Sequence, residues 1–128
     1  PEGFYRLPIL NPDSRYHLSI RVGYPNDEDM AHAIVPRAEM GGDIYLHGGS
    51  ASIGCLALGD PAIEELFCLL ALVPEPAREI WIAPVDLRVD PAHRPADADP
   101  WVGDLYRRLA ERLRECPAGS PGGDSDRR

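Results

Sequence analysis

Residues 16–22 alternate strictly between apolar and polar side chains, and this alternation constrains the fold more than any other feature of the sequence. Neighbouring side chains of a β-strand point to opposite faces, so a period of two predicts a half-buried strand. The predicted inward residues are Tyr16, Leu18, Ile20 and Val22. Shorter apolar runs next to glycine or proline predict further strands at residues 43–46 and 79–83. We therefore expect a mostly β fold.

Two helices are predicted beside these strands. The first has Asp60 as its N-cap and Pro74 as its stop, and its apolar body, residues 63–73, should be largely buried. The second is amphipathic, with apolar residues at every fourth position: Trp101, Leu105, Leu109 and Leu113. Gly, Ser, Asp and Arg predominate beyond it, so residues 117–128 are predicted to be a disordered tail and residues 1–116 one domain.

Composition excludes several classes of function. The chain has 128 residues, of which 44% are hydrophobic, and this suffices for one packed domain. The net charge of -8 argues against nucleic acid or an anionic membrane surface as the main partner. All 13 basic residues are arginines, which excludes mechanisms that need a lysine. No stretch approaches the roughly 18 apolar residues of a membrane span.

The three cysteines, Cys55, Cys68 and Cys116, are too few for a disulfide scaffold or a structural zinc site, and no metal or cofactor is expected. Cys55 has chemical context, because His47 precedes it across a loop of small residues. A cysteine nucleophile needs a nearby base, a group that orients this base and donors for an oxyanion. The spacing alone also fits an inert buried cysteine, which is the commoner case. Cys68, on the apolar helix, is predicted to be such a core residue, and a Cys68–Cys116 bridge stays open.

Several motifs occur in a fixed order along the chain. They are PEGFY at residues 1–5, LNPDSRYHLS at residues 10–19, GYPN at residues 23–26, and HG followed by SIGC within residues 47–55. Together they resemble the catalytic domain of the L,D-transpeptidase (YkuD-type) family, most closely its YafK-like branch. The resemblance runs over roughly residues 1–115, and ordered motifs are more specific than any single one.

The resemblance implies a flattened β-barrel or sandwich with two helices, here without the family's N-terminal strand. It implies that Cys55 is the acylated nucleophile, that His47 is its base and later acid, and that the Gly48 carbonyl orients the imidazole. The backbone N–H groups of Ile53, Gly54 and Cys55 would form the oxyanion hole.

The implied substrates are peptidoglycan stem peptides, attacked through a cysteine thioester in the bacterial cell envelope, at the periplasmic or wall face. An amine would resolve the thioester by transpeptidation, and water would resolve it by hydrolysis, which could detach a wall-linked lipoprotein. The targeting segment is expected outside these residues. Two common family residues are replaced, as they are in the YafK-like branch: Ile53 stands for a histidine and Ala57 for an arginine.

The polar face of the first predicted strand offers substrate-binding candidates: His17, Ser19 and Arg21. Arg21 could bind a carboxylate of the stem peptide, although a solvated arginine and an exposed strand histidine are the simpler interpretations. Ser52 is a further candidate within the nucleophile loop, where a plain turn serine is equally expected.

Two alternatives to an L,D-transpeptidase-like enzyme stay open. One is a catalytically inactive wall-binding module of the same fold, in which Cys55 would lack the reactivity of a paired thiolate. The other is a cysteine peptidase of unrelated fold, but there the cysteine is expected on a helix with its histidine far downstream. Here the histidine comes first.

Overall fold

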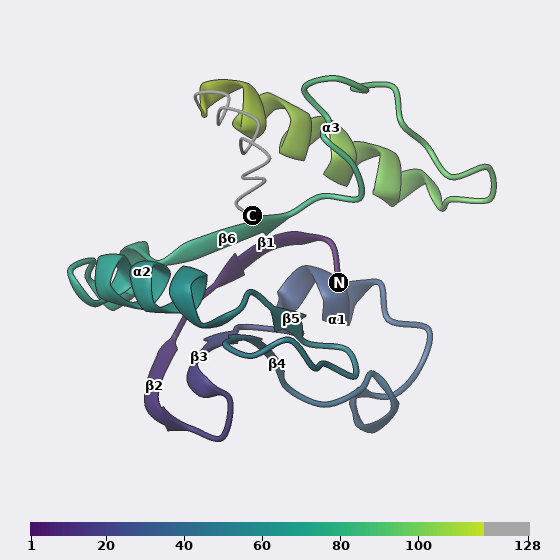
Figure 1. Ribbon diagram of the computed structural model, residues 1–128. Coiled ribbons are helices and arrows are strands. Elements are labelled where there is room, and N and C mark those ends of the chain that lie inside the picture. Colours follow the sequence, from purple (N-terminus) through teal and green to yellow (C-terminus); the bar gives the residue numbers. More distant parts are fainter. Residues whose placement is uncertain (117–128) are drawn as a thin grey trace. The chain divides into compact units, whose positions relative to one another are not determined.

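The computed structural model describes residues 1–116 and divides the chain into two compact units, Pro1–Ile82 and the part from Ala83 onward. The strands are β1 (Gly3–Arg6), β2 (Ile9–Ser14), β3 (His17–Val22), β4 (Ile44–His47), β5 (Leu56–Ala57) and β6 (Glu79–Ile82) (Figure 1). The helices are α1 (Asp27–Ala31), α2 (Asp60–Ala71) and α3 (Pro100–Glu115), with 3-10 turns η1 (Arg37–Glu39) and η2 (Glu75–Ala77). The predicted tail lies outside the described residues, and one catalytic domain over residues 1–116 stays a prediction.

The strands of the first unit form two open sheets rather than a closed barrel in the described residues. The larger sheet has the order β2-β3-β4-β5, in which β4 and β5 run parallel and the other pairs antiparallel. The smaller sheet pairs β1 with β6. The mostly β class is therefore confirmed, with α1 as a third, short helix, and the arrangement is consistent with a partial L,D-transpeptidase-like fold.

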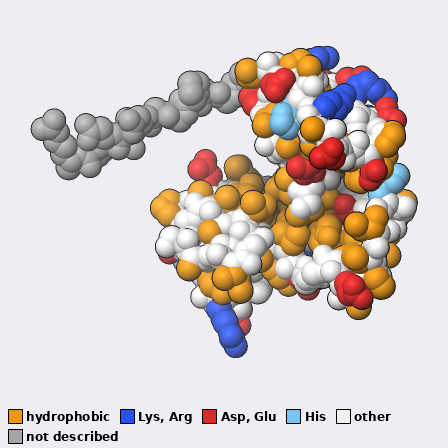
Figure 2. All heavy atoms as spheres, turned by 90° about the vertical axis from the view of Figure 1, so that its right-hand side faces the viewer, with side chains coloured by type: hydrophobic (Ala, Val, Ile, Leu, Met, Phe, Trp, Pro, Cys, Tyr) orange, Lys and Arg blue, Asp and Glu red, His pale blue; other side chains and the backbone are white. Residues whose placement is uncertain are grey.

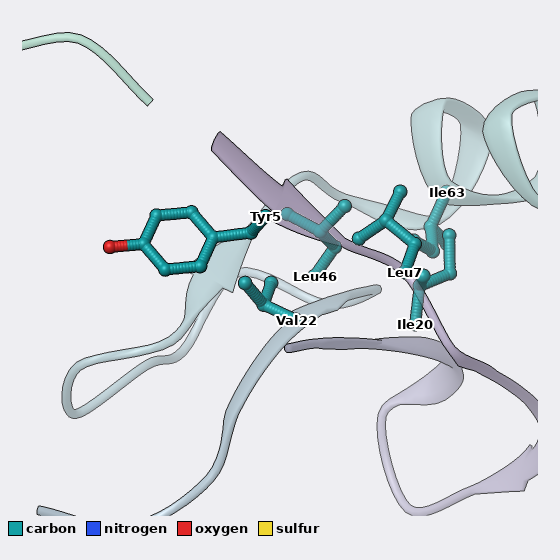
Figure 3. Close-up of a cluster of buried hydrophobic side chains, with 6 residues drawn as sticks. All are labelled: Tyr5, Leu7, Ile20, Val22, Leu46 and Ile63. Carbon is teal, nitrogen blue, oxygen red and sulfur yellow. The ribbon is translucent and has the colours of Figure 1, made fainter. Parts of the chain in front are cut away.

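The core of the first unit lies between the sheet strands and α2, which packs against β3 and β4. Figure 3 shows its six buried side chains: Tyr5, Leu7, Ile20, Val22, Leu46 and Ile63. Two of them were predicted to face inward from the alternating strand, and both are completely buried. This core fixes β4 against β3, and so fixes where His47 ends its strand.

Two expectations about the alternating strand are wrong. Tyr16 does not face inward but is about half exposed before β3 begins. The reason is the backbone of His17, whose φ of 75° lies in the left-handed region and breaks the alternation at that residue. Ser19 was expected on an open polar face, but it is buried and only 5% exposed.

The helix α2 is less buried than its composition predicts. Ile63 is the one buried residue of this helix, whereas Leu72, which follows the last residue of the helix, is 84% exposed. Cys68 is exposed, so its assignment to the core is wrong. A sheet covers a single side of a helix, and the apolar residues on the other side of α2 stay at the surface. Hydrophobic side chains also reach the surface on the face drawn in Figure 2.

The second unit is built around α3. Of the four apolar residues predicted to share one face of this helix, Leu105 and Leu109 are buried, whereas Trp101 and Leu113 are half-buried. Tyr106 and Ala110 of the helix and Leu87 before it are buried as well. The connection before α3 packs on it through His93, whose ring is stacked on Tyr106 at 6.0 Å between centroids. Within residues 1–116, the helices are all too short or too polar to cross a membrane.

Candidate active site

His47 is the last residue of β4, and it is buried, with an exposure of only 3%. On the neighbouring strand it is paired with Ser19. Its Nδ1 lies 2.6 Å from the carbonyl oxygen of Gly48. A carbonyl oxygen only accepts, so Nδ1 is the donor, and Nε2 is the unprotonated nitrogen of the neutral imidazole. The ring is therefore held in the tautomer that a general base requires at Nε2.

Gly48 sits where a larger residue does not fit. A Cβ at this position would lie 2.5 Å from Asp60 Oδ1 and 2.6 Å from the carbonyl oxygen of Tyr16. Real Cβ atoms do not approach other heavy atoms so closely, and one of these two neighbours is backbone. The absence of a side chain lets the strand end, the turn before β3 and the start of α2 converge beside His47.

The loop between His47 and Cys55 is held by side-chain hydrogen bonds. Asp60 was predicted to be the N-cap of α2, but the N-cap is Gly59 and Asp60 is the first residue of the helix. Its Oδ1 instead accepts a hydrogen bond of 2.8 Å from the Gly49 N–H and so anchors the loop. Ser52 Oγ donates to the Cys55 carbonyl at 2.6 Å and accepts from the Gly54 N–H at 3.3 Å. Gly54 has a φ of 131°, which strongly favours glycine. These contacts shape a tight bend that leads Cys55 into β5.

His47 and Cys55 line one cavity, of about 300 Å³, in the first unit. Three other candidates from the sequence line it as well: Ser19, Ser52 and Ile53. The Ile53 side chain is fully exposed at its edge. Cys55 itself is half-buried. The predicted base at the end of β4 and the predicted nucleophile in the bend before β5 thus line the same cavity.

Sequence reasoning missed one wall of this cavity, which comes from the end of β2 and the turn before β3. Its residues are Asn11, Asp13, Ser14, Arg15 and Tyr16, and Tyr45 of β4 joins them. The register of β2 against β3 shifts between Asn11 and Ser14, and such bulges are frequent beside active sites. The cluster of Asn, Pro, Asp and Ser was a turn signal, but sequence did not show that the turn would face His47.

Among the cavity residues that sequence reasoning missed, Tyr16 packs directly against the ring of His47. Its ring centroid lies 4.6 Å from that of His47, with the two planes inclined by 36°. The backbone N–H of Tyr16 donates to Ser14 Oγ at 3.2 Å, which fixes the turn from which the ring projects. The imidazole is thus held on its face by Tyr16 and at its edge by Gly48.

His17 and Arg21 do not line the cavity, and each is engaged elsewhere. His17 Nε2 lies 2.6 Å from Glu64 Oε1 of α2, and both side chains are substantially exposed. Arg21 donates to Asp43 Oδ1 at 2.9 Å, while its Nε is buried with no hydrogen-bond partner in the described structure. Their substrate-binding roles stay predictions that this geometry does not favour.

Within residues 1–116, no group of three or more His, Cys, Asp and Glu side chains is arranged to hold a metal ion. Cys55, Cys68 and Cys116 are all free thiols. Cys68 belongs to the first unit and Cys116 to the second, so the bridge between them stays open.

Comparison with known proteins identifies related sequence. No family model matches the chain. Over 69 residues the chain is 42% identical to "Putative L,D-transpeptidase YafK" from Escherichia coli K12, and equally so to the protein of that name from Escherichia coli O157:H7. This match supports a YafK-like L,D-transpeptidase domain. The aligned stretch covers 52% of this chain and 26% of the YafK relatives, so the match spans about a quarter of the length of those proteins. The predicted resemblance to the YafK-like branch is confirmed.

Proposed function

We propose that this YafK-like domain is a cysteine acyl-transfer enzyme that acts on peptidoglycan stem peptides. The observation that carries the proposal is that His47 and Cys55 line one cavity while the Gly48 carbonyl holds Nδ1 of His47, which directs Nε2 away from that carbonyl as a base. The names of the YafK relatives add the class of reaction. Action at the periplasmic or wall face of the bacterial envelope belongs to the same proposal.

In the proposed reaction, Nε2 of His47 takes the thiol proton, and Sγ of Cys55 attacks the peptide carbonyl carbon. The C–N bond breaks as His47 returns the proton to the leaving amine, and the acyl group stays on sulfur as a thioester. An acceptor amine or a water molecule then attacks the thioester, and the thiol is regenerated. The first outcome is a transpeptidation, and the second is a hydrolysis that would detach a peptide or a wall-linked lipoprotein.

The oxyanion of this reaction needs backbone donors beside Cys55. The resemblance to the L,D-transpeptidase family implied the N–H groups of Ile53, Gly54 and Cys55, but that of Gly54 donates to Ser52 Oγ. A donor that is already bonded is less available for a developing charge. We therefore assign the main part of the oxyanion hole to Ile53 and Cys55, with Ser52 shaping the bend that carries them.

The acyl-enzyme is tested by intact-mass spectrometry of the full chain after incubation with muropeptides. We expect an added acyl mass that disappears in Cys55→Ala and falls at least tenfold in rate in His47→Gln. His32→Gln, at the end of α1 and outside the cavity, is the matched control and should behave as wild type. A new crosslink among the products indicates transpeptidation, and a free peptide indicates hydrolysis.

The inactive wall-binding module is the second candidate, and thiol alkylation separates it from the enzyme. A Cys68→Ser/Cys116→Ser variant leaves Cys55 as the single thiol, since the chain has three cysteines. A Cys55 thiol activated by His47 should react with iodoacetamide faster at neutral pH than the same thiol in a His47→Gln background. Ordinary thiol reactivity, together with retained binding to peptidoglycan, would establish the binding module instead.

A further inference from the structure

The charges around the cavity are few and come from one segment. Among the described residues that line it, Arg15 is the one arginine and Asp13 the one carboxylate, and both lie near the turn between β2 and β3. The chain as a whole carries a net charge of -8, so its general field repels anions. A cation inside the cavity would offset this repulsion for an anionic group of a substrate, and Arg15 is the arginine that lines it.

Arg15 is also chemically available. Its side chain is exposed, and no carboxylate of the described residues forms an ion pair with it. Arg21, the arginine that the sequence favoured as a carboxylate partner, is instead bound to Asp43 and lies outside the cavity. A guanidinium offers paired N–H donors that match the two oxygens of a carboxylate.

The turn that carries Arg15 is fixed on both sides. Ser14 Oγ accepts the N–H of Tyr16, and the ring of Tyr16 lies on His47. One residue further on, His17 is paired with Glu64 of α2. The backbone of Arg15 is thus positioned relative to the imidazole, and its side chain reaches the cavity from a defined point.

We propose that Arg15 is a specificity-determining residue that binds a carboxylate of the substrate beside the bond attacked by Cys55. This proposal rests on the proposed function, and it names the substrate class more narrowly. The preferred peptides carry a free carboxylate close to the scissile carbonyl, as a terminal residue does, and peptides in which that group is an amide are poor substrates. Asp13, on the same wall of the cavity, disfavours a second anion there.

Charge-selective alkylation tests the proposal without requiring turnover. In the Cys68→Ser/Cys116→Ser background, Cys55 is alkylated with iodoacetate and iodoacetamide, and with 6-maleimidohexanoate and N-ethylmaleimide. The ratio of the anionic to the neutral rate should fall about two- to fivefold in Arg15→Gln for at least one pair of reagents, the size expected for an exposed ion pair. Arg37→Gln removes the same charge from the 3-10 turn η1, outside the cavity, and should leave both ratios unchanged.

The outcomes separate this proposal from the proposed function. Equal ratios in wild type and Arg15→Gln, with Cys55 still reactive, overturn the role of Arg15 alone. A Cys55 that reacts with none of the four reagents overturns both. Where acylation by muropeptides is observed, Arg15→Gln should raise KM for a peptide with a free terminal carboxylate and leave the rate with its amide unchanged. An equal loss with both peptides assigns Arg15 a merely structural role and contradicts the proposal.

Discussion

The ring of Tyr16 covers one face of the His47 imidazole at 4.6 Å between centroids, although the two residues lie far apart in the sequence. His47 ends β4, and Tyr16 lies in the turn that precedes β3. The Gly48 carbonyl holds the edge of the same imidazole at 2.6 Å. Two contacts from different directions leave the ring little freedom to rotate, which is the property required of a positioned base.

Replacement of Tyr16 separates the contribution of its ring from that of its hydroxyl. Tyr16→Phe keeps the ring and should behave as wild type, whereas Tyr16→Leu should lose about 0.5–1.5 kcal/mol of unfolding free energy, the usual worth of an aromatic pair. The alkylation rate of Cys55 at neutral pH should fall in the leucine variant alone. Urea denaturation and iodoacetamide kinetics measure the two effects, and a leucine variant equal to wild type in both would show that the contact is incidental.

The position of Tyr16 could not be predicted from the period of the strand. The alternation correctly placed Ile20 and Val22 in the core, because these residues follow regular extended backbone. The alternation failed for Tyr16 because His17 has a positive φ, and a histidine in the sequence does not by itself predict that conformation. The motifs around His47 and Cys55 were identifiable from sequence, but the wall from Asn11 to Tyr16 depends on strand pairing over long sequence separations.

Gly48 is predicted to tolerate no side chain. In Gly48→Ala the new Cβ meets Asp60 Oδ1 and the Tyr16 carbonyl oxygen, so the backbone must move, at a cost of about 2–3 kcal/mol in unfolding free energy. The shift also moves the carbonyl that orients His47, and the reactivity of Cys55 should fall with it. Gly42→Ala is the matched control: apart from its own chain neighbours, no heavy atom lies within 4 Å of a Cβ at this position, and the stability should change little.

Removal of Asp60 should not rescue Gly48→Ala. A Gly48→Ala/Asp60→Ala double variant relieves one of the two close contacts, but the Tyr16 carbonyl belongs to the backbone and remains. It also loses the hydrogen bond from Gly49. Wild-type stability in the double variant would contradict this explanation.

Unlike Gly48, where a side chain should destabilise the fold, His17 has a positive φ at which glycine should be favoured over alanine. A left-handed conformation strains a residue with a Cβ by about 1–2 kcal/mol, while the added flexibility of glycine in the unfolded chain offsets part of this. We expect His17→Gly to be more stable than His17→Ala by about 0.5–1 kcal/mol in urea denaturation. The same pair of substitutions at neighbouring Arg15, which has no positive φ, should favour alanine.

Substitution of Glu64, the ion-pair partner of His17, should change the stability less than substitution of His17 itself. Glu64→Gln removes the charge from an exposed pair and should cost about 0.2–1 kcal/mol. A larger loss than that of His17→Gly would mean that Glu64 acts through a contact other than this one.

The helix α2 shows a second limit of sequence reasoning. Its apolar composition predicted burial on most sides, yet Ile63 is buried and Leu72 is open to solvent. Composition reports how much apolar surface a helix carries, whereas burial depends on what packs against each side. The same distinction explains Cys68, which shares the apolar segment and is exposed.

Tyr5 provides a pH-dependent test of the core. It is 2% exposed, and its hydroxyl donates to Asp29 Oδ1 at 3.0 Å. Burial, reinforced by the Asp29 carboxylate, raises the pKa of Tyr5 well above its usual range. Above about pH 10 the unfolded chain therefore gives up this proton and the folded chain keeps it. Folding then requires proton uptake, so the contribution of Tyr5 to stability falls by about 1.4 kcal/mol per pH unit in that range.

Tyr5→Phe removes both the hydroxyl and its titration. At neutral pH we expect the variant to be about 1 kcal/mol less stable than wild type, because the hydrogen bond to Asp29 is lost. Above about pH 10 the gap should narrow and then reverse, since the variant has no phenol to titrate at this site. Urea denaturation of both proteins from about pH 8 to about pH 11 measures this. Stability curves that stay parallel would mean that the Tyr5 phenol titrates alike in the folded and unfolded chains.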